Sequence, residues 1–209
     1  MPKGRLEAFS DGVIAVAITL LALDLPRPEP EAGRGLAHEL LVRWPSFAAF
    51  GVSFLTIGII WINHHAMLRR LAQVDHRTLL LNLLLLLSVC LLPFSTALMA
   101  DYLKANDGER VAAAIYAGSF LLMSVLFFAM QFYALRRRPH LLHRDITPET
   151  RDAVLRRNAA GLLPYLLATA VAAVSPYVTL AVTALVAVFY AVPSTTADAA
   201  AGAPVERGR

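Results

Sequence analysis

Polar residues that could do chemistry interrupt the apolar stretch RLEAFSDGVIAVAITLLALDLP at residues 5–26. The stretch is long enough to cross a bilayer, yet it carries Ser10 and Asp11 near one end and Thr19 near its middle. A carboxylate at the centre of a membrane helix costs about 2.5–3.5 kcal/mol on insertion scales, and less near an end, so it tends to mark function or a specific partner. We therefore expect Asp11 to have a defined partner.

One face of this helix carries the candidate functional positions. At about 100° per residue, six side chains fall within an arc of about 100°. They are Phe9, Gly12, Val16, Thr19, Leu20 and Leu23. If several copies surround an axis, Val16, Leu20 and Leu23 would form hydrophobic constrictions, and Thr19 would form an oxygen ring that replaces part of an ion's hydration shell. The alternative is a helix-packing face on which Thr19 bonds back to the carbonyl of Ala15.

A second polar group ends the next apolar segment, which finishes WINHH at 61–65. A helix that enters the membrane from outside places this group level with Phe9, Ser10 and Asp11. The pattern predicts a polar cluster that holds the two helices in register, with Arg5 and the histidines as partners of Asp11. Its members would be Ser10, Asp11, Asn63, His64 and His65. The alternative is that the two histidines are anchors at the membrane interface.

These residues do not form a pattern typical of a metal site or an enzyme. Adjacent histidines point about 100° apart on a helix and do not converge as i, i+4 pairs do, so we expect no bound metal. We find no nucleophile–base pair, phosphate loop or cofactor motif, and the single cysteine, Cys90, excludes an internal disulfide. The sequence predicts no catalytic residues and no cofactor.

Composition places the whole chain in a membrane. Of its 209 residues 57% are hydrophobic and only 16% are charged, and the mean hydropathy is +0.58. Runs of roughly 20 apolar residues match about 30 Å of hydrocarbon. We expect an all-α membrane protein with six transmembrane helices, at residues 6–26, 46–66, 78–100, 111–134, 158–174 and 177–193. Ser175 and Pro176 separate the last two, which fits either a tight hairpin or one long kinked segment.

The basic residues predict the orientation. The N-terminus, the 67–77 and 135–157 loops and the tail together hold 14 of the 19 Lys and Arg residues. The positive-inside rule then puts both termini in the cytoplasm. The net charge of +4 reflects this topology and attraction to anionic lipid, because no basic and aromatic constellation indicates a nucleic-acid partner. We expect one transmembrane unit over 1–193, with a surface helix around Leu36–Leu41 and a helix after Asp145, and a disordered tail over 194–209.

The motif residues resemble a known family. RxxxFSDG at 5–12, ITLL at 18–21 and WxxHH at 61–65 are similar to the lysosomal-type potassium channels, transmembrane protein 175 and its bacterial relatives. The resemblance implies a single-repeat bacterial subunit of six helices, four of which assemble with their first helices lining the pore. It implies a constriction at Val16, where Ile or Leu is more usual, further apolar pore positions at Leu20 and Leu23, and a selectivity role for Thr19.

The resemblance also implies a polar lock between the first two membrane helices. Its members are Arg5, Phe9, Ser10, Asp11, Trp61 and either His64 or His65. We therefore expect a channel in a bacterial plasma membrane that passes potassium and other monovalent cations. Its potassium preference over sodium should be modest, because the chain has no TVGYG-type carbonyl filter.

Two alternatives come from other functional classes. A small secondary transporter or proton-coupled carrier would typically show internal repeats and broken helices with midplane charges. A structural or assembly membrane protein would leave Thr19 without a functional role.

Overall fold

The computed structural model describes residues 3–28, 35–105 and 107–191. All regular elements in these ranges are helical, which confirms the predicted all-α class. The long helices are α1 (Lys3–Leu23), α3 (Trp44–Arg70), α4 (His76–Cys90), α5 (Leu92–Tyr102) and α6 (Glu109–Phe132). After a π-helical turn (Tyr133–Arg137) and a 3-10 turn (Pro139–Leu141), the chain forms α7 (Pro148–Ala160), α8 (Leu162–Val171) and α9 (Pro176–Ala191). The short α2 (Leu36–Val42) is the predicted surface helix.

Prolines and small residues decide where long apolar segments break. Pro93 lies in the first turn of α5, where its missing N–H is tolerated, and it separates α4 from α5 within one segment, His76–Tyr102. Gly161 joins α7 to α8 in a helical conformation, so the two follow one another closely. A turn over 172–175 separates α8 from α9, which decides in favour of the predicted hairpin.

Four helical segments in the described residues are long and apolar enough to cross a membrane: Lys3–Leu23, Trp44–Arg70, His76–Tyr102 and Glu109–Arg137. They correspond to the first four predicted spans. The fifth predicted span, 158–174, falls mostly on α8, which is shorter than that span. The sixth begins on the apolar helix Pro176–Tyr190 and extends past the described residues. The predicted tail, 194–209, also lies outside them.

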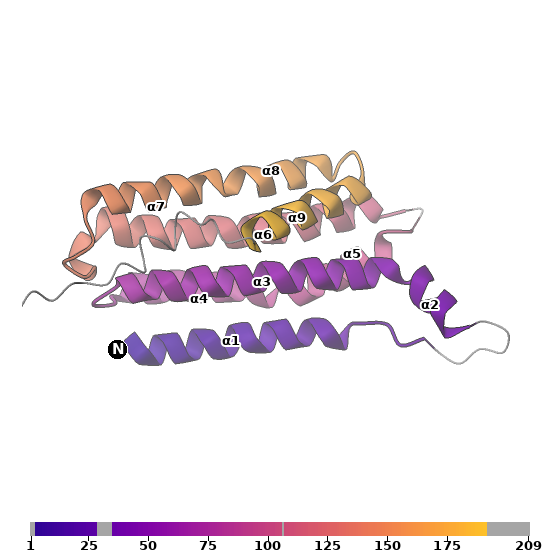
Figure 1. Cartoon of the computed structure of the whole chain (residues 1–209), viewed down its shortest axis with the longest axis horizontal. Coiled ribbons are helices and arrows are strands. Elements are labelled where there is room, and N and C mark those ends of the chain that lie inside the picture. The colour runs from indigo at the N-terminus through magenta and orange to yellow at the C-terminus, as the bar shows by residue number, and fades with distance from the viewer. Residues whose placement is uncertain (1–2, 29–34, 106, 192–209) are drawn as a thin grey trace, which may run out of the picture.

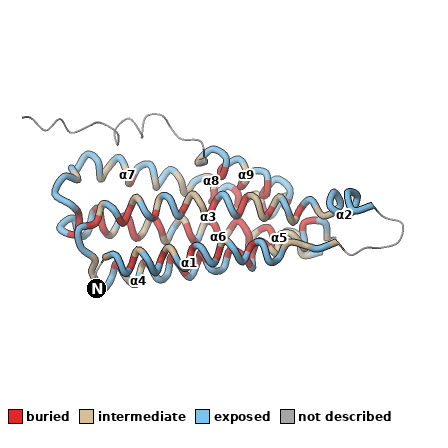
Figure 2. Tube along the Cα trace, turned by 60° about the horizontal axis from the view of Figure 1, so that its bottom comes forward, coloured by how far each residue is buried: buried red, intermediate tan, exposed pale blue. Residues whose placement is uncertain are grey.

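The helices form an elongated bundle with α1 along one edge (Figure 1). This helix packs on α3, α4 and α5, whereas α7, α8 and α9 lie on the opposite side. Between the two edges α6 contacts α4, α5, α8 and α9, and its Tyr116, Phe120 and Met130 are fully buried. Figure 2 shows the buried positions gathered between the helices and the exposed ones along the outside.

Buried hydroxyls join the central helices. Ser53 of α3 hydrogen-bonds to Thr96 of α5 at 2.8 Å and to the Tyr116 hydroxyl of α6 at 3.3 Å. Thr96 also donates to the carbonyl of Leu92 at 2.7 Å. Each polar group therefore has a partner away from water, which a buried hydroxyl needs.

The arginine-rich segments 67–77 and 135–157 lie at one end of the bundle. The start of α1, the α3–α4 loop and the α6–α7 loop share the end marked N in Figure 1, and α2 lies at the other. An antiparallel bridge between Leu71 and Leu142 ties the two loops together. The predicted helix after Asp145 is α7, whose N-cap Thr147 accepts a hydrogen bond from the Thr150 N–H.

Candidate functional site

One face of α1 is exposed in the single subunit. Its opposite face, with Leu6, Ile14 and Leu21, is buried against the bundle. The six residues of the predicted stripe all lie on the exposed side, and Val16 is 57% and Leu23 70% exposed. A side chain added at Gly12 would meet nothing within 4 Å. This apolar face of α1, at the edge of the bundle, is thus not covered by the described part of the chain.

Thr19 bonds back to its own helix. Its Oγ1 donates to the carbonyl of Val16 at 2.8 Å, three residues earlier, and not to the carbonyl of Ala15 as the packing alternative expected. A hydroxyl has one hydrogen and two acceptor lone pairs, so the bond leaves the oxygen able to accept. Thr19 itself lies on the exposed side of α1.

The carboxylate of Asp11 accepts a hydrogen bond from the indole of Trp61. Trp61 Nε1 donates to Asp11 Oδ1 at 2.9 Å, which joins α1 to α3. The Trp61 ring lies 6.3 Å from the His65 ring between centroids. The expected pairing with Arg5 is not found: within the described residues Arg5 is exposed and makes no ion pair, and the hydrogen bond to Asp11 comes from Trp61 rather than from a histidine. The reason is that the rotation of α3 brings the indole, and not an imidazole, to the carboxylate.

A buried chain of hydrogen bonds links three helices beside this contact. Asn82 of α4 donates through Nδ2 to Ser10 Oγ at 3.0 Å, and its Oδ1 lies 2.7 Å from His64 Nε2. Ser10, Asn82 and His64 are 0%, 0% and 1% exposed. Because Oδ1 can only accept, His64 must carry its hydrogen on Nε2. Its Nδ1 is buried and has no hydrogen-bond partner in the described chain.

Sequence reasoning missed Asn82 and misplaced Asn63. The amide of Asn63 donates to the Ile59 carbonyl of its own helix at 3.0 Å, and its side chain faces a cavity beside α6 and α7. Phe9 lies on the exposed stripe of α1. The signal for Asn82 was a single amide inside the apolar run LLLNLLLLL at 79–87. A lone amide in such a run needs a buried partner.

The two contacts fix the rotation of α1 about its axis. Asp11–Trp61 and Ser10–Asn82–His64 hold neighbouring residues of α1 from two different helices. With both in place, the buried face cannot turn outward without leaving several buried polar groups unpaired. Across the described ranges, no three His, Cys, Asp or Glu side chains converge as metal ligands would.

Comparison with known proteins points to one family. Residues 5–93 match the family described as the endosomal/lysosomal potassium channel TMEM175. A protein of Streptomyces collinus named as a potassium channel is 43% identical over 95% of this chain and 98% of its own length. The human endosomal/lysosomal proton channel TMEM175 is 30% identical over 78% of this chain, a region that covers 34% of the human protein.

The fold is similar to that of a solved relative. The crystal structure of a lysosomal potassium-selective channel TMEM175 homolog from Chamaesiphon minutus matches with a TM-score of 0.79 at 38% identity. The match covers 90% of this chain and 96% of that one. The resemblance predicted from the motifs is thereby confirmed.

Proposed function

Because the chain belongs to the TMEM175 family of ion channels, which are not enzymes, we propose that it is a potassium-permeable cation channel whose pore is lined by α1. Several copies of α1 surround the axis, and four is the number that closes the ring. The potassium-channel names of the relatives from Streptomyces collinus and Chamaesiphon minutus support potassium as the permeant ion.

The single observation that carries this proposal is the exposed apolar face of α1 at the edge of the bundle. An uncovered helix face of this kind either meets lipid or meets further copies of the chain. Thr19 lies within it as a polar residue that lipid would not favour. The helix rise of about 1.5 Å per residue spaces Val16, Leu20 and Leu23 over about 10 Å of a common axis. Three apolar levels with a hydroxyl level between them make a narrow pore that can gate by dewetting.

The polar lock supports the pore by setting the direction of the stripe. In this proposal Ser10 and Asp11 orient α1. Asp11 accepts a hydrogen bond from Trp61, which packs beside His65 on α3. Ser10 accepts a hydrogen bond from Asn82 on α4, which also bonds to His64 on α3. His64 fills the buried hydrogen-bonding role and His65 packs beside Trp61. A rotation of α1 by one residue would move Thr19 about 100° away from the axis.

We place the subunit in a bacterial plasma membrane with six membrane helices and both termini in the cytoplasm. This orientation is supported by the arginines of segments 67–77 and 135–157, which lie at the N-terminal end of the bundle. We expect a tag placed after Arg209 to be labelled only by a reagent applied from the cytoplasmic side.

Ion flux from proteoliposomes tests the proposed function. We expect a potassium gradient to drive flux through the reconstituted protein without a proton gradient, with slower flux of sodium and none of a large organic cation. The matched control is Leu122→Ala on the exposed face of α6, which should leave flux unchanged. Saturable potassium movement that requires a proton gradient would instead identify a carrier.

A further inference from the structure

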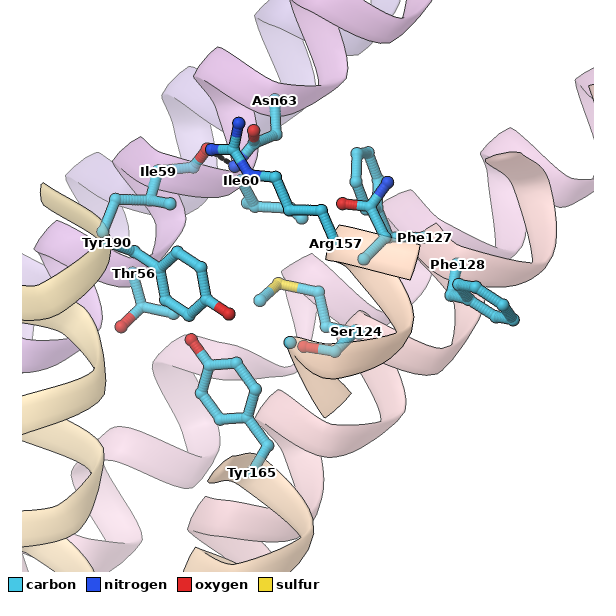
Figure 3. Close-up of a pocket in the computed structure, with 13 residues that line it drawn as sticks. Thr56, Ile59, Ile60, Asn63, Ser124, Phe127, Phe128, Arg157, Tyr165 and Tyr190 are labelled. Atoms are coloured by element: carbon cyan, nitrogen blue, oxygen red, sulfur yellow. Dashed lines mark hydrogen bonds between the residues drawn. The ribbon is translucent and has the colours of Figure 1, made fainter. Parts of the chain in front are cut away.

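A cavity with both apolar and polar lining residues lies on the side of α3 that faces α6 and α7, where the described part of α9 ends (Figure 3). Its volume is about 70 Å³. Gly161, at the α7–α8 junction, and Tyr190, at the end of α9, meet there so closely that a Cβ on Gly161 would lie 3.0 Å from the Tyr190 hydroxyl. The volume is far below the roughly 300–1,000 Å³ of sites that enclose a whole drug-sized molecule, so the cavity fits one chemical group.

The lining combines an apolar floor with hydrogen-bond donors. Ile60, Met123 and Phe127 are buried in its wall. The polar lining residues are Thr56, Asn63, Ser124, Arg157, Asn158, Tyr165 and Tyr190. In Figure 3 the hydroxyls of Tyr165 and Tyr190 point toward the same space, and the Arg157 side chain extends across it to Asn63. None of the lining side chains is acidic, so the cavity offers one positive charge and several donors.

The charge of Arg157 is not neutralised by the described protein. Arg136, on the preceding π-helical turn, pairs with Asp152 at 2.9 Å, whereas Arg157 has no acidic partner within the described ranges. Arg157 lies close enough to Arg70 for their positive charges to repel each other. An arginine that has no acidic partner in the described chain, beside the hydroxyls of Ser124 and Tyr190, is the chemistry that an anion requires.

We propose that this cavity binds a phosphate group, with Arg157 as its ionic partner and the Ser124 and Tyr190 hydroxyls as hydrogen-bond donors. The group belongs either to an anionic phospholipid or to a free phosphate anion. The position of the cavity fits a lipid headgroup. Gly161, which lines the cavity, joins the polar helix α7 to the apolar helix α8, as expected near a membrane surface. Basic pockets between membrane helices are where phosphorylated and anionic headgroups bind.

The test compares two adjacent arginines in the full-length protein. Arg157→Gln removes the charge from the cavity lining, and Arg156→Gln removes the charge of the adjacent residue, which is exposed like Arg157 but does not line the cavity. Binding of phosphatidylglycerol is titrated in mixed micelles by native mass spectrometry, and inorganic phosphate alone is titrated by thermal shift. We expect Arg157→Gln to weaken binding about five-fold and Arg156→Gln to leave it near wild type.

The two arms identify the source of the phosphate. A loss seen only with phosphatidylglycerol assigns the site to lipid, and a loss seen with inorganic phosphate as well assigns it to a free anion. Equal binding by the wild type and both variants would overturn the proposal. If Arg157→Gln does not fold, Tyr190→Phe removes one donor hydroxyl and should still weaken binding; unchanged binding in that variant counts against the site. The assay measures binding and does not depend on ion flux, so it stands apart from the proposed channel function.

Discussion

In the proposed pore, Thr19 would meet the ion with a hydroxyl that is already bonded to the backbone. The bond to the Val16 carbonyl uses its only hydrogen and fixes the side-chain rotamer. A cation coordinates oxygen lone pairs, and donating the hydrogen leaves both lone pairs of the hydroxyl unused. The back-bond and ion coordination are therefore compatible, and the bond holds the oxygen in place before an ion arrives.

Replacing Thr19 by Val tests this role. Thr19→Val keeps the shape and deletes the oxygen, so we expect the potassium preference over sodium to fall. A loss of about 1 kcal/mol changes the permeability ratio about five-fold. The measurement is the reversal potential under bi-ionic conditions. Thr19→Ser, which keeps the oxygen, should retain the ratio, as should Thr169→Val, whose hydroxyl bonds to the Tyr165 carbonyl away from α1. An unchanged ratio in a well-folded Thr19→Val oligomer would leave α1 as a packing helix.

Val16 should act on current more than on selectivity. Val16→Ala removes two methyl groups from an exposed apolar position, which widens a dry constriction and lowers the barrier to its wetting. We expect a larger current per channel with a smaller change in the permeability ratio than in Thr19→Val. Single-channel recording is the measurement, because total current also varies with expression. A reduced unitary current would contradict a constriction at this level.

At the scale of the element, α1 is positioned by partners on two other helices. The Ser10–Asn82–His64 chain is buried, whereas the Asp11–Trp61 bond lies nearer the surface. Buried hydrogen bonds matter most when one partner is lost, since the remaining groups stay desolvated and unpaired. Asn82 is the central member because it bonds to both others.

Two asparagines with different surroundings make a matched test of the lock. Asn82→Leu leaves Ser10 and His64 without partners and should cost roughly 1–3 kcal/mol of stability. Asn63→Leu removes only a bond to a carbonyl of its own helix and should cost less. Thermal unfolding of the detergent-solubilised protein is the measurement. Equal losses in the two variants would show that the chain does not hold α1.

The start of α4 gives a pH-dependent contribution to stability. Partial burial acts to raise the pKa of Asp75, but hydrogen bonds from the Tyr133 hydroxyl and from Thr78, with the positive charge of Arg138, outweigh it and lower the pKa. A lowered pKa in the folded state stabilises the protein above the unfolded value of about 3.9. That stabilisation is lost as the pH falls through this value toward the folded pKa.

Asp75→Asn should therefore lower the unfolding temperature at pH 6, and the difference from wild type should shrink as the pH falls to 3. Thermal unfolding across this range is the measurement. Asp107→Asn, in the exposed turn before α6, is the control and should show no such convergence. A difference that stays constant with pH would mean that the charge of Asp75 is not what stabilises the start of α4.

At the scale of the whole molecule, a single subunit does not enclose a pore in the proposed channel. Buried side chains of α6 fill the core of the bundle, and α1 at its edge presents an apolar face to the outside. One helix cannot enclose an axis, so a conducting pore requires several subunits related by rotation. In the proposed channel, the hydrogen bonds of Ser10 and Asp11 would hold the exposed face of α1 in one orientation toward its copies.

Cysteine cross-linking tests this assembly. With Cys90, the sole cysteine, changed to Ser, we place one cysteine at Leu23 or at Val174. These residues are 70% and 74% exposed and lie toward the same end of the bundle. A short bismaleimide should link subunits of Leu23→Cys, because α1 faces its copies, and leave Val174→Cys as monomers on a denaturing gel. Equal cross-linking of both would contradict an axis lined by α1.

The sequence alone determined the class of protein, the helical segments and the exposed face of α1. Hydrophobic length sets whether a helix can cross a bilayer, and the 3.6-residue period sets which side chains share a face. Both are local properties of the chain. For this reason the stripe from Phe9 to Leu23, the surface helix α2 and the start of α7 could be predicted without coordinates.

Only the tertiary structure decided which polar residues meet. Spacing brings Asp11 and the WINHH segment to one level, but the rotation of α3 about its axis chooses Trp61 as the donor. Packing of α4 against both helices places Asn82 between Ser10 and His64, and turns Asn63 toward the cavity near Arg157. Hydrogen-bond partners depend on distances of about 3 Å between helices, and such distances follow from packing angles that no local pattern encodes.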